Sequence, residues 1–198
     1  MSFDCVATVM KAVNRYRDKR VLVLWSGGVD STALAMALYK AGAKVTLLEV
    51  QTAQTPNYDA EQYYRKQQMK WFKRNNYRFN HIKFAMSSIF GTSVASYVQS
   101  YWWLNIAMLH RVDLYDYIAF GWVASDESTA WFDEYLKVYN SANELLDRPG
   151  PELVIPFGRL DKLEITYFFA SEQEQQIPVW WCEQPDRPAE IGRASCRE

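Results

Sequence analysis

Residues 26–32 have the composition of a loop that binds phosphate. Their order is Ser26, Gly27, Gly28, Val29, Asp30, Ser31 and Thr32, with Trp25 directly before them. Paired glycines let the backbone approach a ligand closely, and a helix that begins here presents N–H groups and hydroxyls to an anion. An aspartate repels phosphate unless it binds Mg²⁺ or orients the loop, so we assign Asp30 one of these two roles. The segment predicts a site for phosphate groups.

A simple tight turn is the alternative interpretation, because glycine pairs are common in turns. The full string between a strand pattern and a helix pattern favours phosphate binding. The segment is not a Walker A loop, since no GKS or GKT follows, and it is not a GxGxxG dinucleotide fingerprint.

The elements on either side of this loop predict how it is held. Residues 21–25 form a short apolar run that is typical of a parallel strand buried on both faces. Residues 32–41 are rich in Ala, Leu and Met and predict a helix that ends at Gly42. Residues 45–50 predict the next strand, so these pieces make a right-handed βαβ unit.

Helix and strand patterns continue to alternate along the chain. Further helices are predicted over residues 3–16, 59–76, 94–110, 129–146 and 161–171, and further strands over 77–84, 117–120 and 153–157. Asp161 is placed to cap the last helix. The fold class is therefore α/β, a Rossmann-like doubly wound parallel sheet with helices on both faces.

Length and composition are those of one globular domain. The chain has 198 residues with 22 basic and 23 acidic side chains, and this balance gives no sign of a surface for polyanions. No segment approaches the roughly 20 apolar residues of a membrane span. Three scattered cysteines do not make a disulfide framework. We expect a cytoplasmic protein with no direct nucleic-acid partner and no membrane partner.

Residues 26–32 resemble the signature of the PP-loop ATP pyrophosphatase superfamily. The resemblance implies an adenine nucleotide alpha hydrolase-like fold, with ATP and Mg²⁺ as cofactors. It also implies cleavage of ATP between the α and β phosphates, with transfer of AMP to a carbonyl or carboxylate oxygen. The ATP-binding residues that it implies are Trp25, Ser26, Gly27, Gly28, Val29, Asp30, Ser31 and Thr32.

Within the superfamily, residues 20–184 are most similar to 7-cyano-7-deazaguanine synthase. Residues 117–123, YIAFGWV, are similar to a strand that ends in a glycine beside the nucleotide, which implies that Gly121 contacts ATP. The acidic positions Asp126 and Asp133 resemble substrate contacts of the family. Gln51 or Gln54 takes the place of a substrate-binding glutamine in a loop that otherwise departs from the family pattern, and we assign Gln51.

The string Asp161-Lys162-Leu163-Glu164-Ile165 is similar to the D-K-x-E-I helix start of that family. A lysine on this first turn can stabilise the charge that develops on pyrophosphate. A solvated helix residue is the alternative. The resemblance makes Lys162 a catalytic residue together with Asp30 and Ser31.

Residues 180–183, WWCE, resemble the start of the family's zinc motif, but the C-x-x-C-x-x-C cluster is absent. Cys182 and Cys196 supply at most two of the four ligands of a structural zinc. We interpret residues 190–198 as a non-native tail that is similar to a translated sequencing adapter, so the single domain spans residues 1–189. Zinc is expected only if the natural C-terminus restores the missing cysteines, with Cys182 as a ligand.

The sequence thus predicts an ATP-dependent C–N ligase that converts 7-carboxy-7-deazaguanine and ammonia to the nitrile through adenylated intermediates. The resemblance implies a homodimer. Another PP-loop adenylating enzyme, acting in tRNA thiolation or in amidation, is the first alternative. The second is a degenerate homologue that binds nucleotide without turnover.

Overall fold

A single parallel sheet organises the chain. The computed structural model describes residues 5–52, 58–86, 104–105, 107, 114–145, 150–171 and 177–179. The strands are β1 (Arg20–Leu24), β2 (Lys44–Thr52), β3 (Asn80–Met86), β4 (Tyr117–Ala119) and β5 (Glu152–Val154). All pairs are parallel, in the order β3-β2-β1-β4-β5. This order, with the first strand central, confirms the doubly wound α/β fold.

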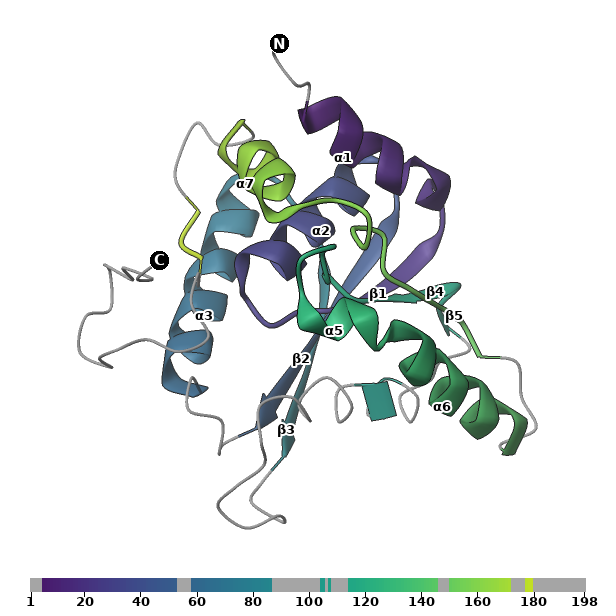
Figure 1. Cartoon of the computed structure of the whole chain (residues 1–198). Coiled ribbons are helices and arrows are strands. Elements are labelled where there is room, and N and C mark those ends of the chain that lie inside the picture. The colour runs from purple at the N-terminus through teal and green to yellow at the C-terminus, as the bar shows by residue number, and fades with distance from the viewer. Residues whose placement is uncertain are drawn as a thin grey trace.

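Helices cover both faces of the sheet (Figure 1). On one face lie α1 (Cys5–Val13) with the short 3₁₀ helix η1 (Asn14–Tyr16), α2 (Val29–Lys40), α3 (Tyr58–Arg74) and α7 (Lys162–Ser171). The other face carries α6 (Phe132–Leu145), which follows the one-turn helix α5 (Glu127–Ala130). Within the described ranges, no helix has the length and apolarity needed to cross a membrane.

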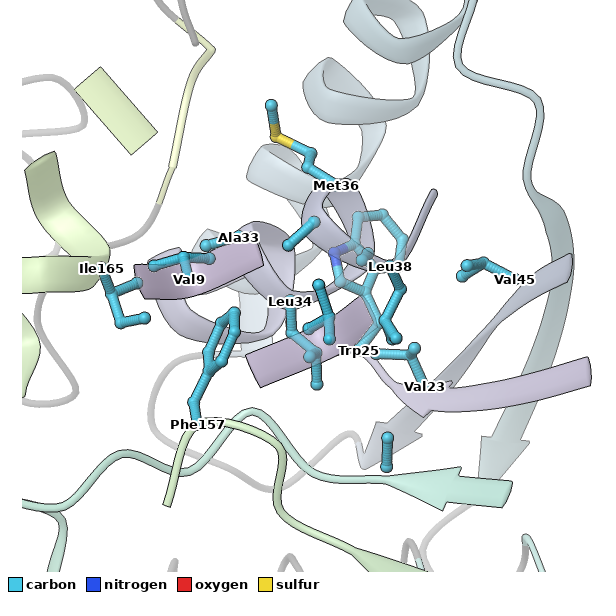
Figure 2. Close-up of a cluster of buried hydrophobic side chains, with 14 of the residues drawn as sticks. Val9, Val23, Trp25, Ala33, Leu34, Met36, Leu38, Val45, Phe157 and Ile165 are labelled. Carbon is cyan, nitrogen blue, oxygen red and sulfur yellow. The ribbon is translucent and has the colours of Figure 1, made fainter. Parts of the chain in front are cut away.

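Alternation along β1 explains why the sheet is covered on both sides. Val21, Val23 and Trp25 belong to the core under α2, whereas Leu22 and Leu24 belong to the core under α6. Figure 2 shows the first core, in which α1, α2 and α7 contribute apolar side chains beside Trp25. Successive strand residues point to opposite faces, so the continuous apolar run that predicted β1 is what a doubly covered strand requires.

Helix α2 is fixed at its C-terminal end by the predicted glycine. Gly42 has a φ of +89°, its N–H donates to the carbonyl of Tyr39, and the N–H of Ala43 donates to the carbonyl of Leu38. These two bonds make a Schellman motif. Nine of the helix's twelve residues are buried, so its N-terminal end is held firmly against the sheet.

Some predicted elements differ in extent from those observed, among them the strand expected over residues 77–84, which is β3 at Asn80–Met86. The helix expected over residues 129–146 is two helices, because the chain turns at Trp131 between α5 and α6. Strand β5 ends at Val154, because a turn follows in which the N–H of Gly158 donates to Ile155 and that of Leu160 to Phe157. Most of the helix expected over residues 94–110 lies outside the described residues.

Candidate nucleotide site

The connections that follow the neighbouring strands β1 and β4 leave the sheet on opposite faces. After β1 the chain enters α2 on one face, and after β4 it leads through α5 to α6 on the other face. In doubly wound folds, ligands bind in the crevice at the carboxyl ends of two such strands, so we refer to this place between β1 and β4 as the crevice. Residues 25–28 follow β1 and residues 120–123 follow β4, so both predicted nucleotide segments border the crevice.

The loop after β1 leads into the first turn of α2, whose amides have no intrahelical acceptor. Gly28 is the N-cap, in an extended conformation and without a side-chain cap. The amides of Val29, Asp30 and Ser31 fall in the first turn, where no intrahelical acceptor exists. The hydroxyls of Ser26 and Ser31 lie 3.1 Å apart beside these amides. Amides, hydroxyls and the positive end of a helix dipole are the groups with which helix N-termini commonly bind anions, so phosphate binding here stays a prediction.

Gly121 lets the end of β4 pack directly on α2. A Cβ atom at Gly121 would lie 2.7 Å from both the N and Cα atoms of Ser31, which leaves no room for any side chain. The glycine therefore closes one wall of the crevice against the phosphate loop. Its predicted contact with ATP stays a prediction.

The structure brings together Asp30 and Lys162, which are 132 residues apart in the sequence. The Nζ of Lys162, the first residue of α7, donates to Oδ2 of Asp30. A capping box fixes this end of α7, since the N–H of Glu164 donates to Asp161 Oδ1 over 2.8 Å and the N–H of Asp161 donates to Glu164 Oε2 over 2.9 Å. The capping role of Asp161 is confirmed, and the cap places Lys162 at the mouth of the loop.

Asp30 is a poorly satisfied carboxylate. Its side chain is 20% exposed, and its Oδ1 atom is buried without a hydrogen-bond partner. Burial raises the pKa of Asp30 above its ordinary value, Lys162 opposes the shift, and the negative charge of Asp126 adds to it. Asp126 is fixed nearby, because its Oδ2 accepts the N–H of Val123 over 3.0 Å at the start of α5.

These two carboxylates fit Mg²⁺. Protein sites for Mg²⁺ commonly supply one or two carboxylates and leave the remaining positions to phosphates and water. Asp30 offers an unpartnered oxygen, and Asp126 lies close enough to affect its pKa. Among the described residues, no group of three or more His, Cys, Asp or Glu side chains could hold a metal ion. The other ligands of Mg²⁺ would therefore be phosphate oxygens and water.

Trp25 and Thr32 lie behind the loop rather than on its open side. Both are fully buried. Trp25 Nε1 donates to Thr32 Oγ1 over 3.2 Å, and Thr32 Oγ1 donates to Gln68 Oε1 over 3.0 Å. The Thr32 hydroxyl is therefore engaged inside the protein, where it connects α2 to α3. Its predicted part in ATP binding, like that of Trp25, stays a prediction.

Helix α3 contributes loop contacts that sequence reasoning missed. Arg65 Nη1 donates to the carbonyl oxygen of Ser26 over 2.7 Å, and Gln68 Nε2 donates to that of Gly27 over 2.7 Å. Glu61, Arg65 and Gln68 are all buried. Their spacing puts them on one side of the helix, but polar residues occur all round α3, so the sequence carries no signal that singles these three out.

Glu49 neutralises Arg65 in a buried charge network. Its carboxylate lies 3.3 Å from Arg65 Nε, 2.9 Å from His81 Nε2 and 2.6 Å from Gln51 Nε2. Burial acts to raise the pKa of Glu49, but the hydrogen bonds from His81 and Gln51 and the charges of Arg65 and Lys83 outweigh it and lower the pKa from 4.5 to about 2. Gln51 thus donates to Glu49 under α3, and its role as a substrate contact stays a prediction.

The last two predicted site residues are not joined to the loop by any described contact. Asp133 lies exposed on the first turn of α6. Cys182, the predicted zinc ligand, lies outside the described residues, as do residues 190–198.

Comparison with known proteins shows relatives by fold alone. No protein-family model matches the chain, and no curated protein sequence matches it. Three solved structures are similar over most of it. The chain has the fold of these proteins.

The first is the U34-tRNA thiolase NcsA from Methanococcus maripaludis with its 4Fe-4S cluster, at a TM-score of 0.57 and 13% identity over 84% of this chain and 63% of the thiolase. The second is a predicted subunit of tRNA methyltransferase from Methanocaldococcus jannaschii, with a TM-score of 0.52 and 16% identity over 77% of this chain and 76% of that subunit. The third is NMN synthetase from Francisella tularensis, with a TM-score of 0.53 and 12% identity over 85% of this chain and 69% of the synthetase. The chain therefore spans less than two thirds of the thiolase's length.

Proposed function

We propose that this chain is an ATP-dependent adenylating enzyme of the PP-loop superfamily. The observation that carries the proposal is the meeting of three distant segments at one crevice: the loop at residues 26–32, Gly121 after β4, and Lys162 at the start of α7. Two of the similar structures are named as a thiolase and a synthetase, which supports a catalytic role over a purely binding one.

Each side chain in the crevice has a role that its position supports. The first-turn amides of α2 and the hydroxyls of Ser26 and Ser31 bind the phosphates. Lys162 lies at the same end of α2, where its charge stabilises negative charge that develops on the departing pyrophosphate. Asp30 and Asp126 would hold Mg²⁺, which supplies charge neutralisation on the phosphates when it is bound.

The reaction proposed first is the one that the family resemblance implies. The carboxylate of 7-carboxy-7-deazaguanine attacks the α-phosphorus of ATP, which forms an acyl-adenylate and releases pyrophosphate. Ammonia then displaces AMP to give the amide. A second ATP adenylates the amide oxygen and releases a second pyrophosphate. Loss of AMP, which carries away the oxygen, and of both amide protons leaves the nitrile, so each nitrile formed consumes two ATP.

Mass spectrometry tests this proposal directly. The protein is incubated with ATP, Mg²⁺, ammonium and 7-carboxy-7-deazaguanine, and both the nucleotides and the base are followed. We expect AMP and pyrophosphate with conversion of the base, and loss of both in Ser31→Ala. Formation of ADP instead of AMP contradicts adenylation. AMP without a changed base leaves the PP-loop proposal standing and moves the search to other acceptors, while bound but uncleaved ATP supports the degenerate homologue.

A tRNA acceptor is a second candidate, favoured by one surface. Helix α3 exposes four basic side chains at a spacing that places them on one face, namely Lys66, Lys70, Lys73 and Arg74. With Lys83 of β3, the first two line a hollow of about 390 Å³. A basic face of this kind suits a phosphate backbone, although the whole chain has no basic excess. Binding of labelled tRNA that weakens in Lys70→Glu, but not in the matched α6 variant Lys137→Glu, would support this acceptor.

A further inference from the structure

Two side chains of α3 fix the direction of successive peptide groups in the phosphate loop. Arg65 holds the carbonyl oxygen of Ser26, and Gln68 holds that of Gly27, each over 2.7 Å. In a planar trans peptide, the carbonyl and the N–H of the next residue point in opposite directions. The N–H groups of Gly27 and Gly28 therefore point away from α3.

Pointing away from α3 means pointing toward the crevice. Helix α3 connects β2 to β3, and Arg65 rests against Glu49 of β2. The crevice lies on the opposite side of β1, where β4 pairs with it. The Gly28 N–H also lies 3.3 Å from Ser26 Oγ, a long contact that leaves it available to a stronger acceptor.

We propose that Arg65 and Gln68 are positioning residues that hold the phosphate loop in its anion-binding orientation before a nucleotide arrives. This inference rests on the proposed function, because it concerns the same phosphate site. Glycine peptides flip easily, since glycine adopts positive and negative φ with similar ease. A flipped Ser26–Gly27 peptide would direct a carbonyl oxygen at the phosphates, which repels them.

The loop and α3 are shaped for one another at Gly27. Its φ is +89°, and a Cβ atom there would lie 2.7 Å from Arg65 Cγ. A side chain at this position would collide with the Arg65 stem as well as strain the backbone. Arg65 therefore requires a glycine opposite it, and the glycine in turn requires an external group to select one peptide orientation.

The side-chain amide of Gln68 makes hydrogen bonds with both its oxygen and its nitrogen. Its Oε1 accepts from Thr32, while its Nε2 donates to the carbonyls of Gly27 and, over 2.9 Å, of Pro178. The residue is fully buried. Glutamate cannot donate these two bonds, and a shorter amide cannot reach all three partners. Gln68 thereby also ties residues 177–179 to the phosphate loop.

Gln68→Met is the decisive variant, because methionine keeps the volume and removes every hydrogen bond. We expect the Kd for ATP–Mg²⁺, measured by calorimetry, to rise roughly tenfold or more, as for loss of one hydrogen bond to a charged group. The ¹⁵N and ¹H shifts of the Gly27 and Gly28 amides in the nucleotide-free protein should change. Gln67→Met, on the adjacent position of α3, should leave both readouts unchanged.

Arg65→Met repeats the test at the second contact, and Lys137→Met, at an exposed position of α6, is its control. Loss of Arg65 removes the buried guanidinium that pairs with both Glu49 and Glu61, so this variant can fail to fold, and Gln68→Met then decides alone. ATP binding by Gln68→Met at the wild-type Kd overturns the positioning role and leaves the proposed function intact. If the wild type does not bind ATP, the proposed function fails, and unchanged Gly27 and Gly28 shifts in Gln68→Met still overturn the inference.

Discussion

Replacement of Asp30 by alanine is expected to stabilise the nucleotide-free protein. One carboxylate oxygen of Asp30 is buried without a hydrogen-bond partner. A buried polar atom without a hydrogen bond costs about 1–3 kcal/mol of folding free energy. The pair with Lys162, whose side chain is 43% exposed, and the position at the N-terminus of α2 each contribute about 0.3–1 kcal/mol. Removal of the carboxylate therefore gains about 1 kcal/mol, which raises the Tm of a domain of this size by about 2–4 °C.

The gain should depend on pH with a definite sign. Burial raises the pKa of Asp30 above its ordinary value of 3.8, against the opposing charge of Lys162. Below pH 3.8 the group is protonated in both the folded and the unfolded state, so wild type and variant differ little through this charge. As the pH rises through 3.8 and then through the higher folded-state pKa, the wild type loses stability relative to the variant.

Thermal unfolding between pH 3 and 8, followed by circular dichroism, measures both effects. Asp133→Ala is the matched control, because it removes an exposed carboxylate from the first turn of α6 and should lower the Tm slightly or leave it unchanged. ATP binding should be lost in Asp30→Ala despite the higher Tm. A lower Tm for Asp30→Ala across the neutral range would refute the reasoning, since it would mean that the folded protein satisfies this carboxylate.

Three further variants probe the site and its support. Glu49→Gln should lower the free energy of unfolding by about 3 kcal/mol at pH 7, because the pKa of Glu49 falls from 4.5 to about 2 on folding. This contribution to stability is lost as the pH falls from 4.5 to about 2. Urea titrations that show an equal loss of stability at pH 7 and pH 3 would contradict the prediction. Gly121→Ala should cost about 1–3 kcal/mol by pressing a methyl group onto the Ser31 backbone, and a Tm equal to that of the wild type would disprove the close contact. Lys162→Met should lower kcat for AMP formation by about 100-fold or more, and it should lower the Tm by about 1–4 °C because the pair with Asp30 is lost. The exposed Lys137→Met should alter neither, and equal kcat values for Lys162→Met and the wild type would remove Lys162 from the mechanism.

The central βαβ unit could be predicted because its determinants are local. A run of apolar residues marks β1, a helix pattern marks α2, and Gly42 supplies the positive φ that ends it. These features depend on neighbours a few residues away, so a single sequence suffices. The phosphate loop is equally local, since paired glycines and a helix start are adjacent in the chain.

The support from α3 could not be predicted in the same way. Arg65 and Gln68 bind backbone carbonyls that lie 39 and 41 residues away, and a carbonyl group leaves no mark in the sequence. Their own residue types suggested only a charged helix face. A role for Asp30 was predicted from the chemistry of the loop, and one for Lys162 through family resemblance, but their direct contact required the folded chain.

The strand order also determines when the crevice can exist during folding. Strand β1 pairs with β2 after a single intervening helix, but its other neighbour, β4, joins through Val21 and Tyr117 across a long stretch of chain. Contacts between distant segments form after local ones, because closing a longer loop costs more entropy. We therefore expect residues 5–86 to assemble the phosphate loop with its α3 supports first.

Gly121 and Lys162 reach the phosphate loop only when β4, β5 and α7 have packed onto the first three strands. A nucleotide that touches both halves binds the docked state and not the separated one, so it stabilises the closed sheet by mass action. A nucleotide bound as we propose would therefore hold β1 and β4 together where the two strands pair. The protein's resistance to opening between these two strands should then follow the concentration of nucleotide around it.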